Sequence, residues 1–342
     1  VTLDSALADN KAKYSQAVSP TGVGWNKHFT YYLAKDTPPV AGLCLGQRDL
    51  YPVYYGFNVT DLARQVNVGE LANPMKLLTG NFDLSYVFVF LFPLLIIVLF
   101  YNLFAAEKEG GTLSLLHAQV ASINTILLSK GILRFLLVCI IATTLLFIGI
   151  LIQGVSFGEY ISMFFSFLLV IFAYCFFWCA MMALIVALRR SSALSAMLGL
   201  GIWLLLTLIA PALINLIISS NQPMPNRTEA IHAVRDRNDQ NWDSPKSFLL
   251  DEFYADYPQY NDGDTLDFDK WYYASFTMLD KEANALNATF EAQLAKRNAM
   301  LARWQWLAPA AMAHDRLSSL AYTDRASLLN FVCVVHRYDQ TL

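Results

Sequence analysis

Charged residues are scarce in this sequence, and they are scarcest in its middle. Asp, Glu, Lys and Arg make up only 15% of the 342 residues, whereas soluble domains usually carry about a quarter. Apolar residues reach 56%, and the mean hydropathy is +0.40. Between Ser85 and Ser219 the charges nearly vanish, and on either side they return at ordinary density. The sequence therefore predicts a membrane protein with two sizeable polar parts.

The sequence also lacks the motifs of nucleotide binding and of catalysis. It has no Gly-x-x-x-x-Gly-Lys-Ser/Thr loop, so this chain does not itself hold ATP in that manner. It has no His-Glu-x-x-His and no Cys-x-x-Cys, the common spacings of zinc ligands. The five histidines are scattered, and no nucleophile is paired with a base. We expect no enzyme activity, metal or cofactor in this chain, and the net charge of −3 gives no reason to expect nucleic acid.

Four apolar runs are each long enough to cross a bilayer, which takes about 20 residues. Their apolar residues are continuous rather than alternating, so they predict helices and not barrel strands. None has Asp, Glu, Lys or His at its centre, which argues against an ion-coupled transporter. The four predicted spans are 85–105, 131–154, 160–188 and 193–218.

The short connections between these spans predict their orientation. The connection 106–130 carries Lys108 and Lys130, and the turn after the third span is Arg189-Arg190. The loop 155–159 has no Lys or Arg. Positively charged short loops face the cytosol. We therefore expect the connection 106–130 and the Arg189-Arg190 turn on the cytosolic side.

Because each span crosses the membrane once, this orientation places both polar segments, 1–84 and 219–342, on the outer side. There they would meet as one extracytoplasmic domain encoded in two pieces. A long outer segment before the first span needs something to carry it across the membrane. We therefore expect six spans in all, with one before Val1 and one after Leu342.

The predicted fold class is mainly α, a polytopic membrane protein with a mixed α/β extracytoplasmic domain. The segment Tyr51–Val59 is aromatic and β-branched and predicts a short strand. The segments Thr228–Asn238 and Thr277–Trp306 predict helices, and the second has apolar residues near 3.6 spacing. We expect this long helix to pack along another helix from residues 1–20.

Aromatic residues and cysteines leave alternatives open. Aromatic residues crowd the second polar segment, Trp242 and Trp271 among them, and this fits either a core with membrane-interface anchors or a surface for a partner or substrate. Cys175 and Cys179 share a helix face and are expected in the core. Cys44 and Cys333 lie in the polar parts and could pair outside the cytosol.

The connection 106–130 is the main candidate site, and we call its stretch Glu107–Leu116 the elbow. Two acidic residues and two glycines are followed by a threonine that can cap an amphipathic helix, with the acids near its positive end. Two leucines on that helix would fit a groove in a partner protein. The plainer interpretation is an interfacial helix that contacts only lipid headgroups. The expected docking residues are Glu107, Glu109, Gly110, Gly111, Thr112, Leu113 and Leu116.

The residues around the elbow resemble a known family, the ABC transporter permeases of the type-2, exporter-like class. In that class the glutamate–glycine–threonine–leucine stretch forms the coupling helix that docks on the ATPase subunit. The resemblance rests on Tyr101-Asn102-Leu103, Glu107-Lys108-Glu109-Gly110-Gly111-Thr112-Leu113 and Lys130.

Further stretches are similar to a bacterial subfamily of these permeases that has large extracytoplasmic insertions and no settled function. Its members have six spans, with outer segments between the first and second and between the fifth and sixth. The similar stretches are Gly46-Gln47-Arg48-Asp49, Pro52, Asn73-Pro74, Gly80-Asn81-Phe82-Asp83-Leu84, Pro93-Leu94-Leu95, Trp306-Leu307-Ala308-Pro309-Ala310 and Leu320-Ala321-Tyr322-Thr323-Asp324.

The resemblance implies the membrane subunit of an ATP-driven transporter in the bacterial inner membrane. ATP and Mg²⁺ would bind a separate ATPase subunit, and a second copy or a related permease would complete the pair within the membrane lipid. Arg189 and Arg190 would add a second cytosolic contact, or they only set orientation. One alternative keeps the ATPase but transmits force to a periplasmic partner without transport. Another is a membrane receptor or scaffold with no ATPase.

Overall fold

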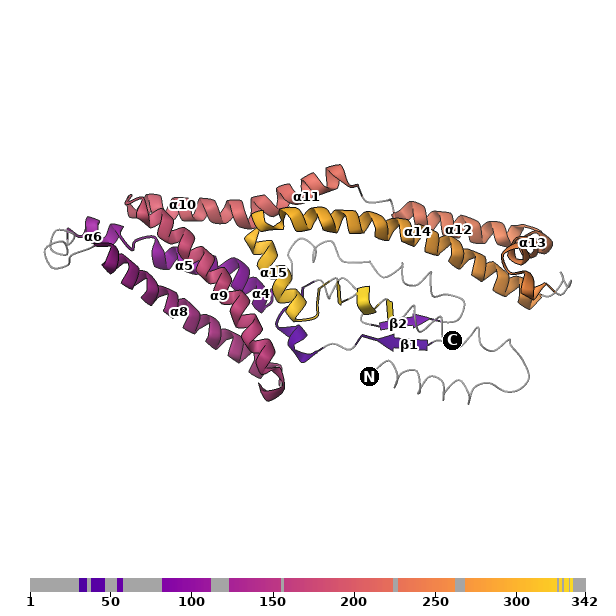
Figure 1. Cartoon of the computed structure of the whole chain (residues 1–342), viewed down its shortest axis with the longest axis horizontal. Helices are drawn as coiled ribbons and strands as arrows, with labels where there is room; N and C mark the ends of the chain where they lie inside the picture. The colour runs from indigo at the N-terminus through magenta and orange to yellow at the C-terminus, as the bar shows by residue number, and fades with distance from the viewer. Residues whose placement is uncertain are drawn as a thin grey trace.

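The structure is a computed structural model of the whole chain, and most of the described residues are helical. The molecule is elongated, with the apolar helices at one end and the polar helices projecting from the other (Figure 1). The residues that the structure describes are 31–35, 38–46, 54–57, 82–111, 123–154, 157–223, 227–261, 268–324, 326–327, 329–331 and 333–334.

The four predicted spans are confirmed as helices long and apolar enough to cross a membrane. The first and the fourth are each built from several consecutive helical segments. In chain order the segments are α4 (Leu84–Tyr86), η4 (Val87–Leu91), α5 (Phe92–Phe100) and α6 (Ala105–Glu109); α8 (Ile123–Ile152); α9 (Phe157–Ala187); and α10 (Ser192–Leu204), η5 (Leu205–Ile209) and α11 (Ala210–Asn221).

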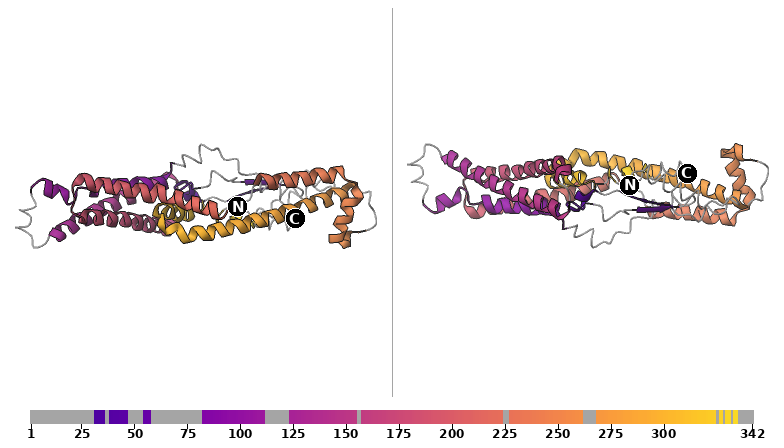
Figure 2. Two further views of the ribbon diagram at one scale, coloured as in Figure 1. Left: turned by 90° about the horizontal axis from the view of Figure 1, so that it is seen from above. Right: turned by 90° about the horizontal axis from the view of Figure 1, so that it is seen from below.

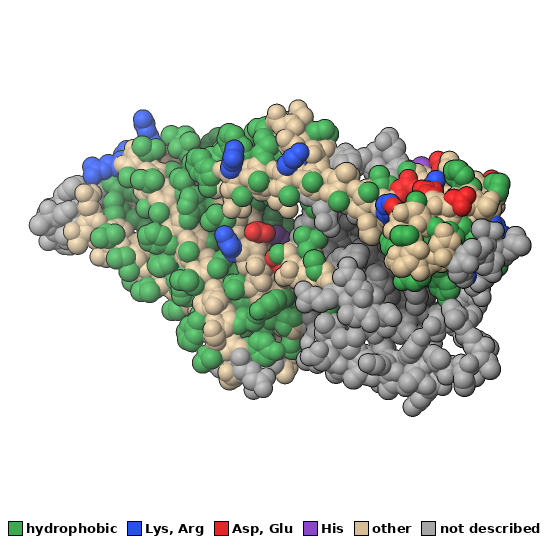
Figure 3. All heavy atoms as spheres, turned by 45° about the vertical axis from the view of Figure 1, so that its right-hand side comes forward, with side chains coloured by type: hydrophobic (Ala, Val, Ile, Leu, Met, Phe, Trp, Pro, Cys, Tyr) green, Lys and Arg blue, Asp and Glu red, His purple; other side chains and the backbone are tan. Residues whose placement is uncertain are grey.

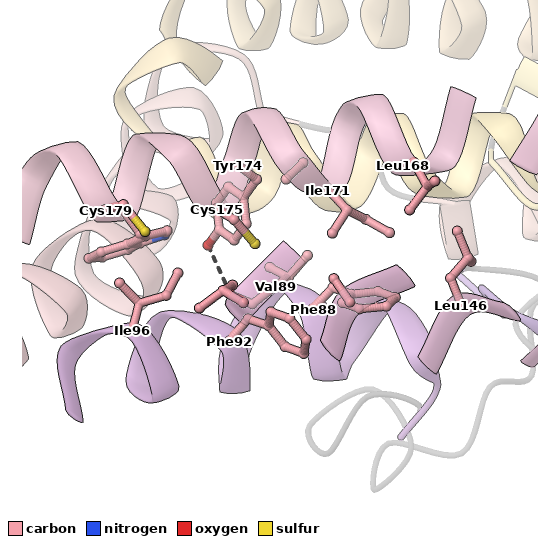
Figure 4. Close-up of a cluster of buried hydrophobic side chains, with 14 of the residues drawn as sticks. Phe88, Val89, Phe92, Ile96, Leu146, Leu168, Ile171, Tyr174, Cys175 and Cys179 are labelled. Atoms are coloured by element: carbon pink, nitrogen blue, oxygen red, sulfur yellow. Dashed lines mark hydrogen bonds between the residues drawn. The ribbon is translucent and has the colours of Figure 1, made fainter. Parts of the chain in front are cut away.

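The first and third spans form the centre of the bundle. Within the protein, 50% of the most apolar stretch of the first span and 44% of that of the third are buried, against 22% and 17% for the second and fourth. Figure 4 shows side chains of the first span, Phe88 and Ile96 among them, packed against Ile171 and Cys175 of α9. The second and fourth spans instead present much of their apolar surface outward, and Figure 3 shows the resulting hydrophobic surface over the membrane helices.

Both multi-segment spans contain one π-helical turn, η4 in the first and η5 in the fourth. A proline follows each within a few residues, Pro93 after η4 and Pro211 after η5. The hydroxyl of Tyr174 on α9 donates to the carbonyl of Val89 in η4 at 2.8 Å (Figure 4). Such a partner matters in a bilayer, where water is absent and backbone polar groups must be satisfied within the protein. π-turns are often found where a helix does functional work.

The polar part is helical apart from one small sheet. Strand β1 (Tyr31–Ala34) pairs antiparallel with β2 (Tyr54–Phe57), which confirms the strand predicted within Tyr51–Val59. The other described elements of the polar part are η2 (Pro39–Gly42), α12 (Arg227–Asp243), α13 (Lys246–Asp256), η6 (Pro258–Tyr260), α14 (Phe268–Trp304), η7 (Gln305–Leu307) and α15 (Pro309–Leu320).

The expectation of a mixed α/β domain is therefore not supported. Two four-residue strands are shorter than a typical strand, and a lone two-stranded sheet is marginal without other packing. The described part of the second polar segment follows helical spacing instead, as its buried face on α14 shows: Trp271, Ala274 and Met278 recur at three- and four-residue intervals.

Helix α14 begins nine residues before the predicted start at Thr277 and ends at Trp304. It packs against α12 and α13, with α13 at the far end of the pair (Figure 2). Leu249 and Leu250 of α13 lie against Trp271 in a small separate core. The expected partner, a helix from residues 1–20, lies outside the described residues.

The two polar segments meet beside the start of the first span. The thiol of Cys44 lies 3.3 Å from the hydroxyl of Ser318 on α15. The backbone N–H of Leu45 donates to Asp83, at the start of the first span, at 2.7 Å. Gly46 has a φ of 52°, and a Cβ there would lie 2.9 Å from the Thr323 hydroxyl oxygen. The segment 38–46 therefore packs closely against α15 and the turn that follows it.

The cysteines do not form the pair that their positions allowed. Cys44 and Cys333 are both free, the first buried and the second exposed. Burial raises the pKa of the Cys44 thiol, which keeps it protonated and unreactive. Cys175 and Cys179 are buried in the bundle, as expected.

Candidate functional site at the elbow

The elbow begins within α6, the last helical segment of the first span. Helix α6 is only five residues long and ends at Glu109. Gly110 closes it by donating its N–H to the carbonyl of Ala106 at 2.9 Å. Gly111 follows with a φ of 69°, a conformation that glycine adopts without steric cost. The last helical turn of the first span therefore ends at two glycines.

Glu107 connects the elbow to the second span. Its carboxylate forms an ion pair with Lys130 of α8. The side chain of Glu107 is 22% exposed and that of Lys130 is 40% exposed, so the pair is partly shielded from water. An ion pair of this kind contributes roughly 0.2–1 kcal/mol, enough to bias an orientation but not to hold it alone.

Glu109 connects the elbow to the fourth span. It accepts hydrogen bonds from the backbone N–H of Ser192 at 3.0 Å and from the Ser192 hydroxyl at 2.9 Å. Ser191 caps the same helix by accepting from the N–H of Leu194 at 3.4 Å. A carboxylate at a helix N-terminus also complements the positive end of the helix dipole. The N-terminus of helix α10 is therefore hydrogen-bonded to the elbow.

The Arg189-Arg190 turn lies beside the elbow. Arg189 lies two residues after the end of α9 and has a φ of 54°, and its guanidinium lies 5.8 Å from the centre of the Phe104 ring. Nearby, Arg134 of α8 donates to the carbonyl of Leu99 and to the side chain of Asn102. Figure 1 shows α6, the start of α8 and the α9–α10 turn at the same end of the molecule.

The structure thus brings together the two connections that the sequence predicted on one side. Of the expected docking residues, Glu107, Glu109, Gly110 and Gly111 form the described part of the elbow. Thr112, Leu113 and Leu116 lie outside the described residues, so the capped amphipathic helix stays a prediction.

Sequence reasoning missed two partners at this site. Lys130 was used as an orientation signal and as part of the family resemblance but not as a partner of Glu107, and Ser192 was not singled out. One signal for Ser192 was present, because Ser191-Ser192 before an apolar run is a typical start of a helix. No pattern in the sequence connects that start to Glu109.

The fourth span also makes a defined contact at its other end. Arg297 of α14 donates to the carbonyl of Gln222 at 2.6 Å and to the hydroxyl of Ser219 at 3.3 Å. Gln293, one turn earlier, donates to the Gln222 side chain and to the carbonyl of Pro223, both at 3.1 Å. The fourth span therefore touches the elbow with its first turn and α14 with its last.

Helix α15 lies across the spans at the level of their π-turns. It packs against α9 and contacts both η4 and η5. Its buried face includes Ala313 and Leu317, which belong to the core of the bundle. The side chain of His314 lies 3.0 Å from the hydroxyl of Ser85, which donates to Asp83 at 2.9 Å. The end of the polar part is therefore joined to the first span by polar contacts as well as by packing.

Comparison with known proteins gives one match. A family model described as "Domain of unknown function (DUF3526)" matches residues 227–342. The chain is therefore similar to that family over the region from α12 through α15. No curated protein and no solved structure matches the chain.

Proposed function

We propose that this chain is the membrane subunit of an ATP-binding-cassette transporter. The observation that carries the proposal is the elbow, a short charged turn joined by carboxylates to two other spans. The sequence around it resembles the segment that docks on the ATPase in type-2 permeases. Because the chain has no phosphate-binding loop, ATP and Mg²⁺ bind a separate subunit.

The contacts of the elbow supply a route for movement. A partner that displaces α6 also displaces α8 through Glu107 and Lys130, and α10 through Glu109 and Ser192. Helices are stiff along their axes, so the fourth span carries that displacement to Arg297 on α14. The π-turns η4 and η5 are the places where the first and fourth spans can bend.

The proposed setting is the bacterial inner membrane. The elbow and the Arg189-Arg190 turn face the cytosol, where Arg189 and Arg190 add a second contact for the ATPase. The polar helices α12 to α15 lie on the outer side. A second copy or a related permease packs in the membrane against an outward apolar face, such as that of the second or fourth span, which are the least buried.

A second candidate function is force transmission without transport. The contact between α11 and α14 favours it, because movement of the fourth span would reach a helix that projects well beyond the bundle (Figure 1). In this version the polar helices act on an envelope partner. ATP-dependent movement of a substrate into vesicles would favour transport, and recovery of an envelope protein with the complex would favour force transmission.

Copurification of the full chain tests the proposal. We expect an ATPase subunit to copurify with the wild-type protein but not with the Leu113→Ala or Leu116→Ala variant. Asp315→Asn on α15, an exposed site away from the elbow, is the matched control and should retain it. If no ATPase is recovered, or if the elbow variants retain as much as the control does, the chain is a receptor or scaffold instead.

A further inference from the structure

The end of the molecule farthest from the elbow carries exposed aromatic rings on a fixed base. Trp242 is 52% exposed and Phe268 is 43% exposed, whereas Trp271 between them is 2% exposed. The ring of Trp271 lies 4.8 Å from that of Trp242 and 5.6 Å from that of Phe268, centre to centre. Rings held in place in this way lose little conformational freedom when a partner binds, which is typical of interface anchors.

The base of these rings belongs to a packed core. Trp271 lies among Leu250, Ala274 and Met278, each 5% exposed or less. Its indole N–H is buried and has no hydrogen-bond partner among the described residues. The exposed rings of Trp242 and Phe268 therefore pack against a side chain that is itself held in a core.

Acidic residues line the same helix. Asp236, Asp239 and Asp243 are exposed and follow one another at three- and four-residue intervals, so they share one face of α12. Trp242 stands beside Asp239 and Asp243 on that helix. None of the three carboxylates makes an ion pair with a residue that the structure describes. Figure 3 shows acidic side chains gathered among hydrophobic ones at this end of the molecule.

Two of the cations near this surface have contacts of their own, and a third, Arg235, is exposed beside Asp236 on α12. Arg237 is engaged by Glu252 at 2.6 Å and by Glu282 at 3.8 Å. Lys246 lies over aromatic rings, with its ammonium 4.7 Å from the centre of Phe268 and 5.6 Å from that of Trp271. The protein thus already places one cation on these rings, which is the geometry of a cation–π contact.

We propose that the surface formed by Trp242, Phe268 and the three carboxylates of α12 binds a Lys- or Arg-bearing protein segment that also carries apolar side chains. The aromatic rings take the apolar groups and the stems of the cations, and the carboxylates pair with the charged heads. A nucleic acid or an anionic lipid headgroup is repelled by the same carboxylates. The proposal does not depend on the ATPase, because the elbow and this surface lie at opposite ends of the molecule (Figure 1).

Binding of two labelled peptides to the purified full chain in detergent tests this inference. The first probe is a fluorescein-labelled peptide of alternating Lys and Leu, and the second is its Glu and Leu counterpart. Fluorescence anisotropy, with empty micelles subtracted, should show saturable binding of the Lys–Leu peptide only. Added salt should weaken that binding, since paired exposed charges are screened.

Matched variants locate the binding. Asp239→Asn with Asp243→Asn should weaken the Lys–Leu peptide about tenfold, and Trp242→Ala should weaken it by a similar factor. Trp306→Ala, which removes a 68% exposed tryptophan elsewhere, and Asp315→Asn should change it less than about twofold. The Asn variants keep the helix surface polar, so they remain informative if Trp242→Ala disturbs folding.

Three results overturn the inference: equal binding of both peptides, no saturable binding of the Lys–Leu peptide, or equal losses in the α12 variants and in their controls. Failure here would leave the elbow proposal standing. Loss of ATPase copurification, in turn, would leave this surface unaffected.

Discussion

Glu109 accepts hydrogen bonds from both the backbone N–H and the hydroxyl of Ser192, a residue 83 positions later in the chain. This contact joins the elbow to the start of the fourth span. A protein that pulls on the elbow therefore pulls on a second helix that has its own contact with the polar part. In the proposed transporter, this arrangement gives the elbow a mechanical role beyond that of a loop between two spans.

The first prediction concerns this contact. Glu109→Ala should reduce ATP-dependent activity of the reconstituted complex several-fold, because it removes every hydrogen bond between α6 and α10 at this point. Ser192→Ala should reduce the activity less, because the backbone N–H of residue 192 still donates to Glu109. The double variant should lose little more than Glu109→Ala alone, since residues that act through one interaction are not additive. Transport or ATP turnover in proteoliposomes measures this. Fully additive losses would show that the two residues act separately.

The ion pair of Glu107 with Lys130 gives a second prediction. Lys130→Glu should lower the free energy of unfolding by more than Lys130→Ala, because it places two carboxylates together. Adding Glu107→Lys should restore most of the loss, about 0.2–1 kcal/mol for a pair at this exposure. Thermal unfolding in detergent at low salt provides the measurement. If the exchanged pair is no more stable than Lys130→Glu alone, the two side chains do not interact in solution.

Sequence reasoning located the spans well, and the reason is physical. The charges at Lys130 and Arg189 mark where apolar runs meet water, and a run without charge has few other folds available. The same uniformity hides η4 and η5, because an apolar residue at every position gives no periodicity to distinguish a π-turn from an α-helix. The start of α14 was missed because aromatic residues such as Trp271 and Tyr272 suit a core, a membrane anchor or a partner surface alike and do not indicate a helix start.

Contacts between distant parts were out of reach for a similar reason. The number of membrane crossings predicted that the two polar segments would lie on the same side and meet, and Cys44 does lie against Ser318. The number of crossings could not predict which residues would touch, because no local pattern encodes a partner 274 positions away. The same limit applies to Glu109 and Ser192 at the elbow.

The third prediction is a pH dependence at the far end of the polar helices. A hydrogen bond from Lys281 to Asp256 raises the pKa of Lys281 above its ordinary value, so the folded form holds this proton more tightly than the unfolded chain. The stabilisation is therefore complete below about pH 10.4, the value in an unfolded chain, and is lost as pH rises through the folded pKa.

Unfolding of the α12–α14 region, followed by tryptophan fluorescence while pH is raised through this range, should reveal that loss. Lys281→Met should remove this part of the pH dependence and leave the rest of the profile in place. An unchanged profile in the variant would mean that the contact with Asp256 contributes nothing.

The fourth prediction concerns the fit of chain 38–46 against α15. Gly46→Ala should destabilise the protein by about 1–2 kcal/mol, because its positive φ disfavours a Cβ and the new methyl group meets the Thr323 side chain. Gly201→Ala is the matched control, since nothing lies within 4 Å of its added Cβ and a helical glycine gains from the change. Thermal unfolding of both variants in detergent compares them. Equal stability of the two variants would contradict the close fit.

Site-directed cross-linking from the elbow tests the central claim most directly. A photoreactive side chain is placed at Lys108, between the two linking carboxylates, and a second is placed at Phe248 on α13 as the control in intact cells. The account predicts that Lys108 cross-links to an ATPase subunit in the cytosol and that Phe248 does not. An ATPase captured from Phe248, or none captured from Lys108, would contradict it.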